Sequence, residues 1–258
     1  MPDTIAPCPR FDPASVAHLE EPVRRYLTHA LVDGAALHED VELTMVGRIK
    51  AGSWLAFSAR QQFAGHDFAW RARAGWGAFK PVHVTDRYSD GKGSTVGRLF
   101  GRFPFLDASG EDTTRAAAGR GAVESIWVPA SLLPERGVRW RAEADDHIVA
   151  TFSAPPEHPD LHLRIDARGA VTSVSVLRWG KVAQPDFGYI PFGADVHAER
   201  RFGGVCIPSQ VTVGWWFGTP RFAPFFESTV LEAWPSQDSV VHRRSHRIAA
   251  DGGRPPRP

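Results

Sequence analysis

Apolar and polar side chains alternate in VELTM (residues 41–45), and the alternation returns in FAWRAR (residues 68–73). A period of two places every second side chain on one face of an extended strand, so these runs predict strands with one apolar face. Turns rich in glycine follow at residues 51–52 and 75–77, at a spacing typical of short hairpins. Residues 41–101 therefore predict a meander of about five antiparallel strands.

The same signals return after residue 138. Alternating runs separated by turns predict about seven more strands up to Trp234, with a loop over the glycine- and proline-rich residues 180–192. One open twisted sheet rarely holds about twelve strands, so we expect the sheet to curl. The expected fold class is mainly β: a curled antiparallel sheet forming a barrel or half-barrel around a hydrophobic cavity.

Two segments carry helical signals instead. Residues 12–32 begin with Asp-Pro, a typical N-cap and first helical residue, and then show apolar residues three and four apart, interrupted at Pro22. Residues 107–134 predict a helical insertion that starts with a turn at 107–110 and covers the cavity as a lid. We expect a single domain over residues 1–234 and a poorly ordered basic tail over 235–258.

Composition narrows the possible partners. A net charge of +1 over 258 residues argues against nucleic acid or an acidic membrane surface as the main partner, because both need a concentrated basic field. No apolar run reaches the length of a transmembrane segment, and the first ten residues lack the features of a signal peptide, so a cytoplasmic location is expected. The oligomeric state stays open. The expected partner is a hydrophobic small molecule, since 9 Trp and 16 Phe suit a ligand cavity as well as a core.

Signatures of nucleotide, flavin and zinc-protease sites are absent from the sequence, so no cofactor is expected. The best metal candidate is His158 with His162, but the prolines around them prevent the helix that would align the two rings, and no metal is expected. Alternation places His197, Glu199 and Arg201 on one face of a strand. That face either lines a cavity or forms a ladder of solvated charges.

Glu124 and Asp107 are the candidate catalytic residues. Glu124 precedes Trp127 beside a turn bounded by prolines, where burial would raise the pKa of the carboxyl group and suit it to general acid–base chemistry. Alternatively, Trp127 only anchors the insertion to the sheet. The candidate substrate-binding residues are the large rings and polarising groups of the strands and the insertion: Trp70, Tyr88, Trp127, Trp179, Arg201 and Trp215.

Several short stretches resemble a bacterial family of uncharacterised domains over roughly residues 20 to 234. The stretches are EPVRRYL (21–27), FAWRA (68–72), DASG (107–110), ESIWVPASLLP (124–134), GVRW (137–140), GGVCIP (203–208) and VGWW (213–216). This family is similar in build to the lipoprotein-carrier half-barrels, in which a curled sheet holds acyl chains against a helical lid. The resemblance implies a fold and a hydrophobic cavity, and it implies no catalytic residues.

Three hypotheses for function follow. The first is a cofactor-independent cyclase or isomerase of secondary metabolism, because folding a flexible hydrophobic substrate into a reactive conformer removes much of a barrier without a cofactor. The alternative is a non-catalytic carrier of a lipid or hydrophobic metabolite, and a weaker one is a protein-interaction module that uses a sheet edge. Ionisable side chains that converge inside the cavity would favour the enzyme.

Overall fold

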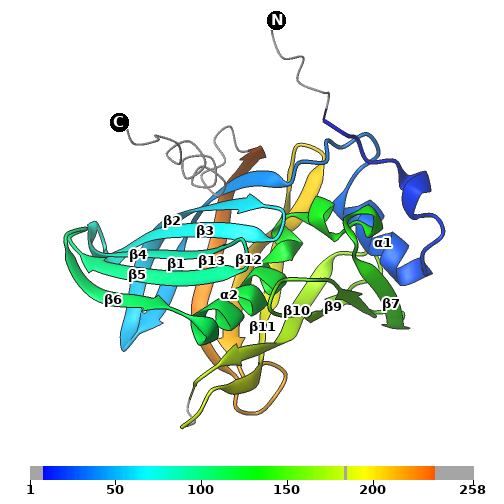
Figure 1. Ribbon diagram of the computed structural model, residues 1–258. Helices are drawn as coiled ribbons and strands as arrows, with labels where there is room; N and C mark the ends of the chain where they lie inside the picture. Colours follow the sequence, from blue (N-terminus) through cyan, green and yellow to red (C-terminus); the bar gives the residue numbers. More distant parts are fainter. Residues whose placement is uncertain (1–7, 183–184, 236–258) are drawn as a thin grey trace, which may run out of the picture.

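The computed structural model describes residues 8–182 and 185–235 (Figure 1). The tail expected over 235–258 therefore lies outside the described residues, except for Pro235 at the end of the last strand. In chain order the elements are η1 (Pro13–Val16), α1 (Glu21–Ala30), β1 (Asp40–Ala51), β2 (Ser53–Ala64), β3 (Asp67–Trp76), β4 (Phe79–Ser89), β5 (Lys92–Leu99), β6 (Phe103–Ser109), α2 (Glu111–Glu124), η2 (Ser125–Trp127), η3 (Pro129–Leu132), η4 (Pro134–Arg136), β7 (Arg139–Ala144), β8 (His147–Thr151), β9 (Asp160–Ile165), β10 (Val171–Gly180), β11 (Gly188–Phe202), β12 (Val205–Trp215) and β13 (Ala223–Pro235).

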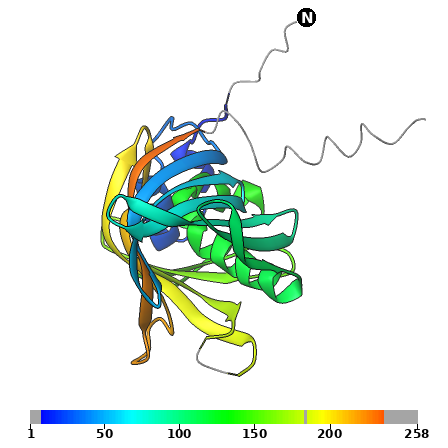
Figure 2. The ribbon, with the colours of Figure 1, turned by 90° about the vertical axis from the view of Figure 1, so that its left-hand side faces the viewer.

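The strands form one 13-stranded antiparallel sheet made of two meanders, in the order β6-β5-β4-β3-β2-β1-β13-β12-β11-β10-β9-β8-β7. The first and last strands join the meanders, since β1 pairs with β13. The outermost strands, β6 and β7, do not pair with each other, so the sheet curls without closing, as Figure 2 shows. The prediction of a mainly β fold with a curled antiparallel sheet is confirmed, in its half-barrel form.

Two segments differ from the predicted elements. Residues 107–109, expected in a turn, belong to the edge strand β6, where Asp107 pairs with Val96. The expected loop over 180–192 is shorter, because β11 begins at Gly188 and Tyr189 pairs with Trp179. In the first segment the hydrogen bonds to a neighbouring strand outweigh the turn preference of aspartate and serine, and in the second that of proline and glycine.

Helix α2 lies inside the curl of the sheet and contacts both arms, β5 on one side and β10 on the other (Figure 2). Small residues make this fit possible. A Cβ atom added at Gly93 of β5 would lie 2.7 Å from the carbonyl oxygen of Thr113, and one added at Gly119 of α2 would lie 2.8 Å from Cγ of Arg178. The helix therefore runs unbroken through Gly119 and Gly121, glycines that weaken an isolated helix, because packing on both sides stabilises it.

Candidate functional site

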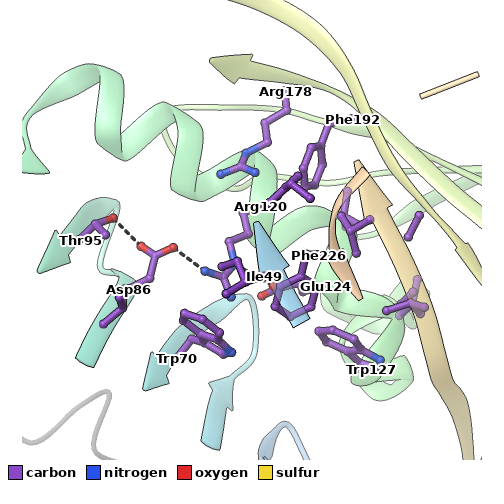
Figure 3. Close-up of a pocket in the computed structure, with 17 residues that line it drawn as sticks. Ile49, Trp70, Asp86, Thr95, Arg120, Glu124, Trp127, Arg178, Phe192 and Phe226 are labelled. Atoms are coloured by element: carbon purple, nitrogen blue, oxygen red, sulfur yellow. Dashed lines mark hydrogen bonds and ion pairs between the residues drawn. The ribbon is translucent and has the colours of Figure 1, made fainter. Parts of the chain in front are cut away.

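A cavity of about 240 Å³ lies between the concave face of the sheet and the C-terminal half of α2 (Figure 3). Four charged side chains line it, namely Asp86 of β4, Arg120 and Glu124 of α2, and Arg178 of β10. The rest of the wall is almost entirely apolar: Ile49, Trp70, Val84, Val123, Ile126, Trp127, Phe192, Ala194, Val211, Val213, Phe225 and Phe226, with Thr95 beside Asp86.

Arg120 is fully paired. Its guanidinium group forms ion pairs with Asp86 and, over 2.7 Å, with Glu124, and these three side chains are only 12–16% exposed. Thr95 donates a further hydrogen bond of 2.9 Å to Asp86, and Gln61 donates one of 2.5 Å to Glu124. Burial alone would lower the pKa of Arg120, but the charges of Glu124 and Asp86 raise it. The network is thus internally satisfied and holds α2 against β2 and β4.

Arg178 differs from Arg120 although both face the same space (Figure 3). Its Nε donates a 2.8 Å hydrogen bond to the carbonyl oxygen of Ala116, and its guanidinium lies 4.5 Å and 4.9 Å from the ring centroids of Phe192 and Trp215. Among the residues that the structure describes, no carboxylate lies within ion-pair distance of Arg178, and its terminal nitrogens have no hydrogen-bond partner. Burial, reinforced by the charge of Arg120, lowers the pKa of Arg178 to about 10.

The structure brings three of the predicted site residues together at the cavity: Trp70, Glu124 and Trp127. Trp127 also borders a second apolar cavity of about 240 Å³, and its indole nitrogen donates a 3.0 Å hydrogen bond to the carbonyl oxygen of Pro208. Trp127 therefore forms part of the cavity wall and also anchors the segment after α2 to the sheet, the two alternatives that the sequence left open. Trp215 does not line the cavity but packs against two residues that do, Arg178 and Phe192.

The other predicted site residues lie away from this cavity. Asp107 and Arg201 are exposed on β6 and β11. Tyr88 is buried and donates its hydroxyl to the carbonyl oxygen of Pro155, and burial raises the pKa of this tyrosine to about 12. Trp179 donates a 2.7 Å hydrogen bond to Asp112 near the start of α2.

Sequence reasoning missed Asp86, Arg120 and Arg178. For two of them a signal was present, because Arg178 follows Val174 and Val176 at two-residue spacing, and Asp86 follows Val84. In both strands the apolar alternation predicts an apolar residue on the buried face, and a charged residue stands there instead. Such a residue indicates a polar group inside the cavity. Arg120 had no such signal, since the glycine- and alanine-rich helix around it shows no clear apolar stripe.

Among the described residues, two clusters elsewhere hold donor atoms suited to a metal: His29 with Glu199 and Cys206, and Glu143 with His147 and His162. In the first, His29 and Glu199 are already joined by a 2.7 Å hydrogen bond. In the second, His162 contacts His147 over 3.0 Å. It does not pair with His158, which is exposed. Irregular pairing of β11 between Val196 and Glu199 breaks the alternation that placed Glu199 beside His197 and Arg201 on one face.

The ring of His66 contacts the turn that follows α2, and its environment predicts that the stability of the fold falls in acid. It stacks on Phe152 with ring centroids 4.4 Å apart, its Nδ1 lies 3.2 Å from Oγ of Ser125, and burial lowers its pKa to about 4. Because the unfolded chain takes up this proton near the ordinary pKa of 6.5, stability is fully present above that pH and is lost as the pH falls toward 4.

We therefore expect the free energy of unfolding to fall by about 1 kcal/mol between about pH 7.5 and about pH 5.5 through this side chain. Urea denaturation of the wild type and of His66→Gln at both pH values measures it. An equal fall in the two proteins would assign the acid sensitivity to other groups.

Within the described ranges, no helix is both long and apolar enough to cross a bilayer. No curated protein matches the chain. Among solved structures, a domain described as belonging to an outer membrane lipoprotein-sorting protein of Vibrio parahaemolyticus aligns with a TM-score of 0.43 and 8% identity, covering 81% of this chain and 90% of that one. A LolA superfamily protein of Nitrosomonas europaea aligns with a TM-score of 0.43 and 5% identity, covering 84% and 93%.

The model of a protein family matches residues 9–228, which is most of the chain and includes every residue that lines the cavity between the sheet and α2. All the stretches that resemble a family of uncharacterised domains lie inside this range. The chain belongs to a family of unknown function, DUF6544.

Proposed function

We propose that this protein binds an amphiphilic small molecule with a hydrophobic body and an acidic head group, and that Arg178 holds the head group. The observation that carries the proposal is the guanidinium of Arg178, which faces a mostly apolar cavity and has no ion-pair partner among the described residues. An unpaired buried charge is costly, so such groups are found paired or bound to a ligand of opposite charge. A carboxylate matches the planar fork of a guanidinium group and completes the pair.

The cavity walls support a hydrophobic body for this ligand. Trp70, Trp127 and Phe226 offer rigid apolar surface opposite Arg178, which suits an acyl chain or a fused ring. The volume of about 240 Å³ equals roughly eight water molecules of about 30 Å³ each, so a ligand of roughly ten non-hydrogen atoms suits it. Asp86 and Glu124 do not compete for Arg178, because Arg120, Thr95 and Gln61 already occupy them.

A second candidate function is the cofactor-independent cyclase or isomerase. The convergence of Asp86, Arg120, Glu124 and Arg178 in one cavity favours it, because such chemistry needs ionisable groups inside. In that case Arg178 would polarise a substrate carbonyl and Glu124 would move a proton, whereas Asp107 is exposed on β6 and has no route to the cavity ligand. Native mass spectrometry with organic extraction separates the two: a mixture of lipids supports a carrier, and one discrete metabolite supports an enzyme.

The acidic head group is tested with octanoate, 1-octanol and octylamine, which share an eight-carbon chain. Isothermal titration calorimetry on protein stripped of co-purified lipid gives the three dissociation constants. We expect octanoate to bind at least about tenfold more tightly than 1-octanol, and octylamine most weakly, because only the carboxylate forms charge-assisted hydrogen bonds with Arg178. Equal affinity for octanoate and 1-octanol would refute the proposal that Arg178 binds an acidic head group, but it would still support a hydrophobic ligand site. No binding of either would refute the ligand cavity itself.

A further inference from the structure

Exposed aromatic side chains gather where the first meander turns. We define the aromatic rim as the exposed large apolar residues of the β3–β4 and β5–β6 hairpins and of β6, namely Trp76, Phe79, Leu99, Phe100, Phe103, Phe105 and Leu106. Trp76, Phe79 and Phe100 are 61%, 58% and 62% exposed. Single exposed rings are ordinary, but a contiguous group of them marks a surface that meets an apolar partner.

The two hairpins lie side by side, at the left of Figure 1. The ring centroids of Phe79 and Phe100 are 6.1 Å apart, and the backbone N–H of Phe100 donates a 2.6 Å hydrogen bond to the carbonyl oxygen of Pro81. Phe100 and Gly101 have positive φ angles of 54° and 70°, as in the tight two-residue turn of a hairpin. The rim is therefore one surface made by two neighbouring turns.

The charge at the tips of the two hairpins has one sign, although Asp107 lies exposed farther along β6. Residues 76–85 and 94–106 contain Lys80, Arg98 and Arg102 and no aspartate or glutamate. Arg98 and Arg102 are exposed, and the guanidinium of Arg102 lies 5.8 Å from the ring centroid of Phe103. The net charge of +1 for the whole chain conceals this local basic field.

We propose that the aromatic rim docks the protein on a membrane surface that contains anionic lipids. Aromatic rings lie at the boundary between headgroups and acyl chains, and neighbouring cations bind the negative headgroups. The competing occupant is a second copy of this chain that pairs along the open edge of β6. Pro104 and the irregular pairing of β5 with β6 beside it interrupt that edge, which makes it a poor template for strand addition.

The proposal does not depend on what the cavity binds. Docking would bring the open side of the half-barrel to a source of amphiphiles, yet the rim residues do not line the cavity between the sheet and α2. Substitutions in the rim should therefore leave the affinity for octanoate unchanged. This separates a failure of membrane docking from a failure of the proposed ligand site.

Co-flotation of the full chain with vesicles tests the docking. We expect binding to phosphatidylcholine vesicles that contain phosphatidylglycerol, and at least about tenfold weaker partitioning onto phosphatidylcholine alone. Phe79→Ser with Phe100→Ser should lower partitioning at least about tenfold, and Arg98→Gln with Arg102→Gln by about tenfold or more, since each cation near such a surface contributes about fivefold.

Leu177→Ser is the matched control, because Leu177 is 64% exposed on β10, outside the rim, and its loss should leave partitioning unchanged. Equal partitioning onto both vesicle types, or an equal loss with Leu177→Ser, would overturn the proposal. Size-exclusion chromatography with light scattering tests the competing occupant. A dimer that becomes a monomer in the Phe79/Phe100 variant would replace the membrane by a second copy of the chain.

Discussion

Replacing Arg120 by methionine is expected to lower the free energy of unfolding by about 3 kcal/mol or more. Methionine keeps much of the length and the apolar stem of arginine but removes the charge that Asp86 and Glu124 share. Both carboxylates would then lose the cation that pairs with them, with only Thr95 and Gln61 left as hydrogen-bond donors. Removing one partner of a buried ion pair costs more than the pair contributes, because the remaining charge stays desolvated.

Arg48→Met is the matched control for this experiment. Arg48 also pairs with a carboxylate, that of Glu227, but its side chain is 58% exposed and solvent can replace the partner. We expect a loss of at most about 1 kcal/mol for this exposed pair. Urea denaturation of both variants at neutral pH gives the comparison. Similar losses for Arg120→Met and Arg48→Met would show that the cavity is open to water and that its network contributes little to stability.

Replacing Arg178 by methionine is expected to have the opposite effect on stability. The pKa of Arg178 falls from 12.5 to about 10 on folding, so the charged form is less stable in the folded protein than in the unfolded chain. A pKa shift costs about 1.4 kcal/mol per unit, and part of this gain is offset because the contacts with Phe192 and Trp215 are lost. Removing the charge should therefore raise the free energy of unfolding by about 2 kcal/mol. The same variant should bind octanoate at least about tenfold more weakly, with its affinity for 1-octanol unchanged.

Two measurements on the same protein therefore decide the role of Arg178. Arg178→Lys keeps the charge but loses the planar fork, so its affinity for octanoate should lie between those of the wild type and Arg178→Met. A less stable Arg178→Met would make Arg178 a structural residue that fixes α2 through the carbonyl oxygen of Ala116. Unchanged binding of octanoate would remove Arg178 from the ligand site.

The fold could be predicted from the sequence because alternation is a local property. Runs such as residues 41–45 and 68–73 need no knowledge of their neighbours to form strands with one apolar face, and the number of strands requires the sheet to curl. The prediction of strands was wrong where pairing with a neighbouring strand decides whether a segment is extended. Residues 103–109 and 188–192 carry loop-like sequences, but each lies beside a strand whose hydrogen bonds need a partner.

Part of the candidate site could be predicted, namely three of the eight site residues that the sequence suggested. Trp70, Glu124 and Trp127 were identified from ring size and from their position near a lid, and all three line the cavity. Asp107 was assigned to the insertion but lies on the exposed edge strand β6, because the insertion begins later than the sequence indicates. Whether Arg178 is paired depends on where α2 and β4 place their carboxylates. These two elements lie about sixty and ninety positions before Arg178 in the sequence, so local patterns do not reveal the distance.

By itself, the sequence determined most of the strands and the two helical segments, because periodicity acts between neighbouring residues. Only the tertiary structure decided how the charges are distributed. It pairs Arg120 with two carboxylates and leaves Arg178 without one, and it gathers Lys80, Arg98 and Arg102 beside the aromatic rim of a nearly neutral chain. Electrostatic effects depend on distance and burial in space, which composition and net charge do not contain.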